Sequence, residues 1–339
     1  MQVTHQPTAD NRPSAPRRAE PPGHEAGALP AEAPDPRHEA DYAARFDGLR
    51  RLYGQAGVER MRRTHVVVIG IGGVGSWSAE ALARSGFERI SLIDLDDVCI
   101  TNVNRQLHAL DTTLGRSKIE VMCERLRLIN PWLDVRAVEG FITPHNIERM
   151  LPPDTGYVID AIDHVGAKCA LIHYCRRKRL PITVTGAAGG LTDPTRITVA
   201  DLTRTEHDPL LAKVRNRLRR DYGYSRNPKR RFSLGCVYSP EQRRYPDGAG
   251  GVCQSRPAAG ESLRAGCSSG YGAAVVVTGA FGFAAVAHAT DRIVARPASV
   301  AAPVSVCSQA HGSSQAHIPS QTRAPTQGAD ADEADHHAE

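Results

Sequence analysis

The sequence predicts an α/β fold in which a doubly wound, mostly parallel sheet is covered by helices on both faces, with disordered termini. Two observations support this prediction. Short apolar runs alternate with amphipathic stretches along the middle of the chain, as expected for parallel strands joined by helical crossovers. Both ends of the 339-residue chain lack a hydrophobic period.

The two ends are expected to be disordered. Residues 1–41 form a leader rich in Pro, Ala, Glu and Arg, and residues 297–339 form a tail that repeats Ser, Gln, Ala, His and Asp. Such segments bury too little apolar surface to offset the entropy lost on ordering. The folded body is therefore predicted to cover residues 42–296.

Within this body, apolar runs predict strands at residues 65–69, 90–93, 135–138, 157–162 and 182–185. Amphipathic stretches predict helices at residues 75–85, 117–129 and 166–179. Residues 271–289 carry no formal charge, and this uncharged run is long enough to raise the question of a membrane span. Their many Gly and Ala residues favour a buried core helix, with membrane association as the alternative.

Composition gives weaker constraints. A net charge of +5 and a pI near 8.8 permit an anionic partner such as RNA without requiring one. The eight cysteines form no C-x-x-C pair, and the N-terminus carries no apolar signal stretch. These features predict reduced thiols in a cytoplasmic protein.

The strongest local signal is a glycine turn between the first predicted strand and helix. The apolar run ends in Gly70-x-Gly72-x-x-Gly75, and glycines there allow backbone N–H groups at the helix N-terminus to approach a phosphate. The next strand ends in Asp94, at the spacing where a carboxylate reaches ribose hydroxyls. The body is thus predicted to be Rossmann-like, and these residues alone fit NAD as well as ATP.

The residues after Asp94 favour ATP. Polar and charged side chains follow the next strand ends, namely Asp96, Asn102, Asn104, Arg105, Gln106 and Lys118. Two cations at a phosphate crevice suit a triphosphate, whose leaving group needs charge neutralisation. The run YVIDAID adds Asp160 and Asp163 at the same edge, where a carboxylate can hold Mg²⁺ between phosphate oxygens.

These motifs resemble the ubiquitin-activating-type (ThiF/MoeB-like) adenylating family, in which G-x-G-G-x-G, D-x-D, N-x-x-R-Q, a Lys and a late D-N or D-S mark the ATP and Mg²⁺ site. The resemblance implies nucleotide contacts from Gly73, Asp94, Asn102, Asn104, Arg105, Lys118 and Asp163. It implies that Arg105 and Lys118 stabilise phosphate charge and that Asp163 binds Mg²⁺. His164 departs from the usual Asn or Ser. An Arg before the first strand normally reaches the partner subunit's ATP, and Arg51 is the candidate.

Within that family, the segments IGIGGVGSW, LIDLDDVCITNVNRQ, INPW, GAAGG, DPL and CSSGYGAA resemble the tRNA threonylcarbamoyladenosine dehydratases. That resemblance implies a homodimer that uses ATP to convert threonylcarbamoyladenosine in tRNA to its cyclic form. It divides the body into a nucleotide-binding core at 64–200 and a substrate and dimer region at 201–296. The chemistry is plausible on its own, because a phosphorylated or adenylylated carboxylate is open to intramolecular attack by the neighbouring carbamoyl group.

A basic segment could bind the RNA. Residues 213–232 carry nine Lys or Arg against one acid, interleaved with Tyr222, Tyr224 and Phe232. Such a segment can bind phosphates and offer rings for stacking unpaired bases, although a solvated helix face is the alternative. The tRNA-binding candidates are Arg217, Arg220, Lys229, Arg230 and Arg231.

Two alternative functions stay open. One is an adenylyltransferase that activates a ubiquitin-like sulfur carrier, with a sulfur-relay protein as partner; the missing zinc-binding C-x-x-C pairs disfavour it. The other is a non-catalytic, nucleotide-dependent RNA-binding module. Cys236 and Cys267 could form a thioester, but buried structural cysteines are preferred. His108 is expected to be a packed or hydrogen-bonding residue.

Overall fold

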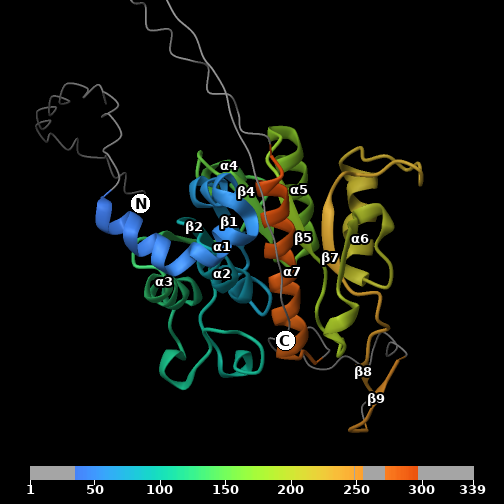
Figure 1. Ribbon diagram of the computed structural model, residues 1–339. Coiled ribbons are helices and arrows are strands. Elements are labelled where there is room, and N and C mark those ends of the chain that lie inside the picture. The colour runs from blue at the N-terminus through green and yellow to red at the C-terminus, as the bar shows by residue number, and fades with distance from the viewer. Residues whose placement is uncertain (1–34, 248, 255–271, 297–339) are drawn as a thin grey trace, which may run out of the picture. The chain divides into compact units, whose positions relative to one another are not determined.

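The computed structural model describes residues 35–247, 249–254 and 272–296, all of which belong to one compact unit. Its centre is a seven-stranded sheet with the order β3-β2-β1-β4-β5-β7-β6 (Figure 1). The strands are β1 (His65–Ile69), β2 (Arg89–Asp94), β3 (Asp134–Glu139), β4 (Tyr157–Asp160), β5 (Ile182–Thr185), β6 (Thr198–Asp201) and β7 (Gly235–Tyr238). Neighbouring strands run parallel except β6, which is antiparallel to β7. The predicted doubly wound, mostly parallel sheet is therefore confirmed.

Seven helices of the described residues surround or extend this sheet. They are α1 (Pro36–Arg63), α2 (Gly75–Arg84), α3 (Lys118–Ile129), α4 (Ile147–Met150), α5 (Val165–Lys178), α6 (Pro209–Asp221) and α7 (Val275–Val294). Short 3-10 helices lie at Ile100–Asn102, Asp111–Thr113, Pro194–Arg196 and Leu202–Arg204. The strands β8 (Tyr245–Pro246) and β9 (Val252–Cys253) form a separate two-stranded sheet. All the strands and helices predicted from the sequence are present, with bounds shifted by a few residues.

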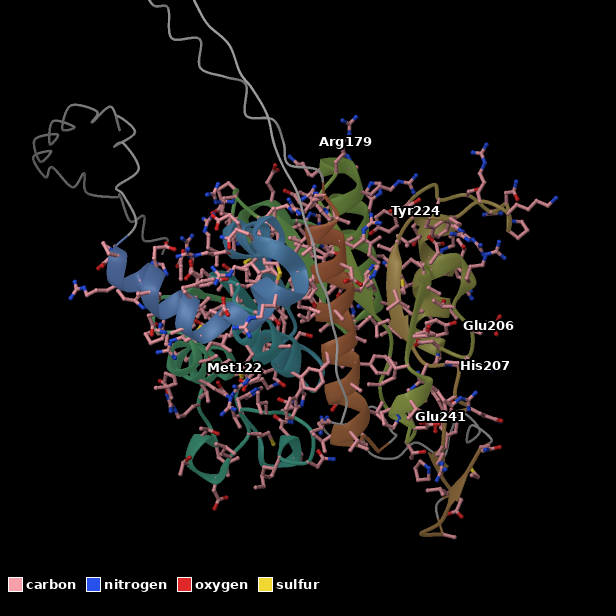
Figure 2. All side chains as sticks on the ribbon, in the orientation of Figure 1. Met122, Arg179, Glu206, His207, Tyr224 and Glu241 are labelled. Carbon is pink, nitrogen blue, oxygen red and sulfur yellow. The ribbon has the colours of Figure 1, made fainter. Side chains whose placement is uncertain are left out.

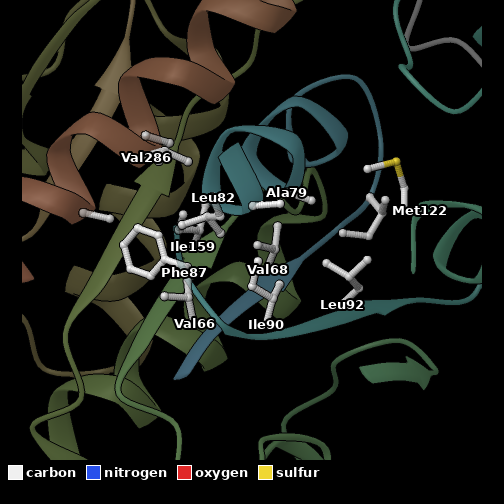
Figure 3. Packing of buried hydrophobic residues seen from close by; sticks show 14 of the residues in the cluster. Val66, Val68, Ala79, Leu82, Phe87, Ile90, Leu92, Met122, Ile159 and Val286 are labelled. Atoms are coloured by element: carbon white, nitrogen blue, oxygen red, sulfur yellow. The ribbon is translucent and has the colours of Figure 1, made fainter. Parts of the chain in front are cut away.

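The alternation of side chains along the strands assigns the helices to two faces. Val68 and Leu92 belong to the buried cluster of α2, α3 and α7, in which Figure 3 shows Leu82 of α2 and Val286 of α7. The intervening strand residues, such as Val67, pack on the opposite face with α4 and α5. Helix α6 covers that same face over β5 and β7. Both faces are thus covered, which explains why the central strands carry apolar residues on both faces.

Helix α1 begins at Pro36, before the expected boundary at residue 42, so residues 36–41 are helical and not disordered. Asp35 caps the helix by accepting a hydrogen bond from the N–H of Arg37. The ring of His38 stacks on Trp132 at a centroid distance of 4.6 Å. The local cap and the long-range contact with Trp132 stabilise a turn that has no hydrophobic period of its own. The expected disorder of residues 1–34 and 297–339 lies outside the described residues.

The charge-free run near the C-terminus forms α7, which packs against α1, α2 and the sheet. Phe281 and Ala285 are completely buried in the main core. Gly282 lies so close to Trp77 that a Cβ on it would lie 2.8 Å from the Trp77 Cβ. The prediction of a buried core helix is confirmed, and among the described helices none is long and apolar enough to cross a bilayer. Tyr271 itself lies outside the described residues.

Candidate active site

The turn between β1 and α2 contains four glycines with different roles. Gly70 has a φ of 87°, and a Cβ on it would lie 2.9 Å from the carbonyl oxygen of Ala161. A Cβ on Gly75 would overlap the carbonyl oxygen of Gly70. The turn can therefore close only if these two positions lack side chains. Gly70, Gly72 and Gly73 line a cavity, whereas Gly75 does not.

Asp94, the last residue of β2, is buried and lines the same cavity. Its Oδ2 accepts a hydrogen bond from the N–H of Ile71 at 2.6 Å, and its Oδ1 accepts from the N–H groups of Leu95 at 2.8 Å and Asp96 at 2.9 Å. The carboxylate thus holds the glycine turn against β2. Because a carboxylate offers about four acceptor positions, one remains for a ligand hydroxyl.

The segment after β2 contributes Asn102, Asn104 and Arg105 to the cavity wall. The Nδ2 of Asn104 donates to the carbonyl of Ala273 at 3.0 Å, next to the start of α7. Arg105 donates through Nη1 to the Thr101 carbonyl at 2.8 Å and to Asn104 Oδ1 at 3.0 Å. These bonds fix the guanidinium at the cavity, where its other N–H groups can serve a ligand.

Lys118, the first residue of α3, is buried at the cavity and forms an ion pair with Asp96. Its Nζ lies 2.7 Å from Asp96 Oδ2, and the side chains are 7% and 54% exposed respectively. An ammonium group has three donors, so two remain for an anionic ligand. The pair keeps the cation in position while leaving it available to phosphate oxygens.

The segment after β4 contributes Asp163 and His164 to the cavity. His164 is the N-cap of α5, where its Nδ1 accepts a hydrogen bond from the N–H of Ala167 at 3.2 Å. Asn and Ser commonly fill this capping role. The departure of His164 from the usual residue therefore preserves the local structure that follows Asp163.

Asp160 ends β4 at the expected sheet edge, but its carboxylate does not line the cavity. It forms an ion pair with Lys168 at 2.9 Å, and both side chains are completely buried. Thr185 donates through its Oγ1 to the Asp160 carbonyl at 3.1 Å. Asp160 therefore has a structural role beneath the site, and Asp163 is the carboxylate of this segment that lines the cavity.

One cavity of about 1850 Å³ brings the predicted nucleotide residues together: Gly70, Gly72, Gly73, Asp94, Asp96, Asn102, Asn104, Arg105, Lys118 and Asp163. It lies beyond the carboxyl ends of β1 and β4, between which the strand order reverses, and doubly wound sheets bind ligands at this switch point. Arg51 is not among its lining residues. The Arg51 side chain is 80% exposed and pairs with Asp47, so its expected role toward a partner subunit stays a prediction.

A second wall of the cavity was not predicted from the sequence. It is formed by residues 185–189 after β5 and by Pro209, Leu210 and Lys213 of α6. Asp208 joins these parts, because its Oδ2 accepts from the N–H of Ala187 at 2.9 Å and its Oδ1 from that of Leu211 at 2.9 Å. The Asp208-Pro209 pair is a common helix start and was the one available signal.

Arg243 completes this wall from a distant part of the chain. Its guanidinium donates to the carbonyls of Ala187, at 2.6 Å, and Gly189. The Arg243 side chain is only 3% exposed. Nothing in the local sequence indicated this role, since the contacts join residues more than fifty positions apart.

The basic segment divides between α6 and the loop after it. Lys229, Arg230 and Arg231 are exposed in the loop, whereas Arg217 and Arg220 of α6 both contact Asp221. The aromatic part of the prediction is wrong for two rings. Tyr224, labelled in Figure 2, and Phe232 are buried. Their rings pack edge to face at 4.8 Å, where they complete the core beneath α6 and cannot stack on bases.

The cysteine prediction is confirmed for Cys236. It is completely buried in β7, and burial raises the pKa of its thiol well above the usual value, which disfavours the thiolate needed for a thioester. Cys267 lies outside the described residues. Cys99 was not singled out from the sequence, but it lines the cavity, and a hydrogen bond from the Thr101 hydroxyl lowers the pKa of its thiol.

His108 is packed, as expected, but neither ring nitrogen has a hydrogen-bond partner among the described residues. Burial, together with the nearby Lys118 ammonium, lowers its pKa to about 4. The ring is therefore neutral at physiological pH. The described residues contain no group of three or more His, Cys, Asp or Glu side chains suited to binding a metal.

Comparison with known proteins adds independent information. The ThiF family profile matches residues 46–313, beyond the expected end of the folded body at 296. The tRNA threonylcarbamoyladenosine dehydratase of Escherichia coli is 50% identical over 254 residues, covering 75% of this chain and 95% of that protein. The corresponding protein of Haemophilus influenzae is 47% identical, covering 76% and 95%.

A solved structure agrees with the sequence comparison. The crystal structure of the E. coli tRNA N6-threonylcarbamoyladenosine dehydratase in complex with ATP has a TM-score of 0.67 and 47% identity, covering 75% of this chain and 96% of that chain. The chain belongs to the ThiF family and, within it, to the tRNA threonylcarbamoyladenosine dehydratases.

Proposed function

We propose that this protein uses ATP to dehydrate threonylcarbamoyladenosine in tRNA to its cyclic form. One observation carries the proposal. A chain half identical to the E. coli dehydratase over 95% of that protein has donors and cations suited to a triphosphate around one cavity. The same relative has been crystallised with ATP.

The reaction follows from the chemistry of the carboxylate. A carboxylate oxygen of the threonyl group attacks a phosphorus atom of ATP, and pyrophosphate or ADP leaves. The carbamoyl group then attacks the acyl carbon, AMP leaves if pyrophosphate left first and phosphate leaves if ADP left first, and the carbamoyl group loses a proton as the ring closes. The net result is loss of one water from the base. Because the ring closure is intramolecular, the protein needs no nucleophile of its own and acts by positioning and charge neutralisation.

Arg105 and Lys118 supply that neutralisation in the proposed mechanism. Both line the cavity, and both have N–H donors that are not used by Asn104, Thr101 or Asp96. Removing one such donor from a transition state usually costs about 10²- to 10³-fold in rate. Asp94 has one free acceptor position for a ribose hydroxyl. Asn102 and Asn104 supply further polar contacts to the nucleotide.

Magnesium is part of the proposal. Mg²⁺ is usually bound by one or two carboxylates together with substrate phosphates and water, so a single cavity-facing carboxylate, Asp163, fits that donor set. The bound ion would neutralise phosphate charge. The fit can be tested without turnover, because Asp163→Asn should weaken the Mg²⁺ dependence of ATP binding in calorimetry.

We propose that tRNA binds along the basic segment. Lys229, Arg230 and Arg231 are exposed, and Arg217 and Arg220 extend the positive surface along α6. Reversing the three loop charges to Glu should raise the KM for tRNA and flatten its salt dependence, because each phosphate contact contributes about 0.7–0.9 to the slope of log K against log salt. The KM for ATP should not change.

The control for this experiment is a charge reversal away from the segment. Arg37 and Arg63 of α1 are 87% and 79% exposed, so reversing them changes the net charge without touching α6 or its loop. If those variants weaken tRNA binding as much as the loop variant, the effect is one of overall charge. The assigned surface would then be wrong.

We further propose a cytoplasmic homodimer in which Arg51 reaches the partner subunit's ATP. The support is that Arg51 is exposed and does not line the cavity of its own chain. Light scattering should give twice the chain mass, and Arg51→Ala should weaken ATP binding only under conditions in which the dimer forms. A sulfur-relay protein as a further partner stays a prediction.

The decisive experiment is mass spectrometry of nucleosides from modified tRNA after incubation with enzyme, ATP and Mg²⁺. The expected result is loss of one water from threonylcarbamoyladenosine, and reactions without ATP or with Lys118→Ala serve as controls. If tRNA stays unchanged while a ubiquitin-like protein stimulates ATP–pyrophosphate exchange, the protein is a sulfur-carrier activator instead. ATP binding without either reaction would indicate a non-catalytic module.

A further inference from the structure

The cavity is larger than a nucleotide alone requires. Its volume of about 1850 Å³ exceeds the roughly 300–1,000 Å³ typical of a pocket for one small ligand. The predicted nucleotide residues line the part that follows β1, β2 and β4. A further part is lined by residues 185–189 and by Pro209, Leu210 and Lys213. The cavity therefore has room for a second ligand next to the nucleotide.

Lys213 is the cation of this second part. The two cations assigned to the nucleotide are already engaged, Lys118 with Asp96 and Arg105 with Asn104 and the Thr101 carbonyl. Within the described part of the chain, Lys213 makes no ion pair, and its side chain is exposed at the cavity wall. An uncompensated ammonium group in a concave site attracts an anionic ligand.

The wall that bears Lys213 is rigid. Asp208 caps α6 and also accepts from the N–H of Ala187, so the start of the helix is fixed to the segment after β5. A Cβ on Gly186 would overlap Asp208 Oδ2, which explains why a glycine allows this approach. The chain enters Asp208 through His207, which is labelled in Figure 2. Its φ of 53° lies in the left-handed region, which non-glycine residues adopt uncommonly.

Helix α6 carries further cations between Lys213 and the protein surface. Arg217 and Arg220 follow Lys213 at i+4 and i+7, so the three cations lie on one face of the helix. Its positive N-terminal end also lies at the cavity, since Pro209 and Leu210 line it. An RNA bound along α6 would thus be led toward the nucleotide.

We propose that Lys213 is a substrate-binding residue that ion-pairs with an oxyanion of the tRNA at the target nucleoside. This inference rests on the proposed function. The substrate brings a carboxylate into a cavity that already holds a triphosphate of the same sign, and a cation reserved for the substrate offsets that repulsion. The oxyanion is either the threonyl carboxylate or a backbone phosphate beside it.

The test compares Lys213→Ala and Lys213→Arg with the wild-type protein. Lys178→Ala is the control, because Lys178 is an exposed Lys of α5 that pairs with Glu148 and does not line the cavity. In Lys213→Ala the KM for modified tRNA should rise about 10- to 100-fold, while the KM for ATP and the unfolding temperature stay unchanged. Lys213→Arg should restore part of the affinity, and Lys178→Ala should behave as wild type.

Binding to tRNA with and without the threonylcarbamoyl group distinguishes the two oxyanions. If Lys213 binds the carboxylate, Lys213→Ala weakens binding of the modified tRNA only. If it binds a phosphate, both tRNAs lose affinity and the salt slope falls by about 0.7–0.9. An unchanged KM for tRNA, or an equal rise in the KM for ATP, overturns the assignment. Because these binding measurements need no turnover, they are separate from the mass-spectrometric test of the reaction.

Discussion

Substituting alanine at two glycines of the same turn separates phosphate binding from folding. In Gly75→Ala the new Cβ would overlap the carbonyl oxygen of Gly70 and lie 2.9 Å from its carbon, both backbone atoms that cannot rotate away. Overpacking of this kind costs about 1–3 kcal/mol, and in a protein of this size each kcal/mol lowers Tm by about 2–4 °C. We expect Gly75→Ala to unfold roughly 2–12 °C below the wild type.

Gly72→Ala should have the opposite profile. The atom nearest to its new Cβ is Gln106 Nε2 at 4.0 Å, and its φ is not in the left-handed region, so the fold accommodates the methyl group. That methyl group would enter the cavity where the phosphates are expected. A clash of about 1–3 kcal/mol with the ligand weakens ATP binding by about 5- to 150-fold.

Thermal unfolding and calorimetric titration with ATP measure the two effects on the same samples. Each variant acts as the control for the other, because both add one methyl group to one turn. If Gly72→Ala binds ATP as tightly as the wild type, the phosphates do not contact this turn. If Gly75→Ala is as stable as the wild type, the argument from the backbone overlap is wrong.

Three further predictions concern single side chains. Lys118→Ala should lower kcat about 10²- to 10³-fold, because a charge-neutralising donor is lost. Its stability should change little, because the remaining Asp96 carboxylate is half-exposed to water. Product formation at saturating ATP measures kcat, and an unchanged kcat contradicts the prediction. The pKa of His108 is lowered from 6.5 to about 4 in the folded protein, so the fold favours the neutral ring. The stability that this preference contributes is complete above pH 6.5 and is lost as the pH falls from 6.5 toward 4, at about 1.4 kcal/mol per pH unit. In urea unfolding at about pH 7.5 and about pH 5, His108→Leu should therefore lose less stability than the wild type, and equal losses would refute the buried neutral ring. Cys236→Ser should keep its turnover while losing about 1–3 kcal/mol of stability from a buried hydroxyl, and a folded variant without activity would revive the thioester.

The parts of the site that the sequence predicted are those that local geometry determines. The glycine turn, the strand ending in Asp94 and the cation at the start of α3 all lie within one β-α-β-α segment. There, spacing alone places side chains at the carboxyl edge of the sheet. The same reasoning could not separate Asp160 from Asp163. Both follow one strand, and only the position of Lys168 on α5 shows which carboxylate turns inward.

The sequence was least informative where function depends on packing between distant segments. Tyr224 and Phe232 have the spacing of base-stacking aromatics in a basic segment, but α6 packs across β5 and β7 and needs apolar side chains beneath it. An aromatic ring bordered by cations has no sequence signal that distinguishes a core position from an RNA-binding position. Burial of the ring decides, and burial depends on the fold of the whole α6 region.

The two walls of the cavity are held by different kinds of interaction, and this difference bears on how the enzyme can vary. The nucleotide wall depends on backbone geometry, in which Asp94 accepts three N–H groups and Gly70 and Gly75 allow close approach, so changes at these three positions disturb the fold of the turn as well as the site. The second wall is held together by side chains, because Asp208 and Arg243 form hydrogen bonds with the segment after β5. Lys213 projects from that wall without supporting it. A residue of this kind can change without cost to the fold, so the RNA side of the cavity is where substrate preference can diverge while the ATP side stays fixed.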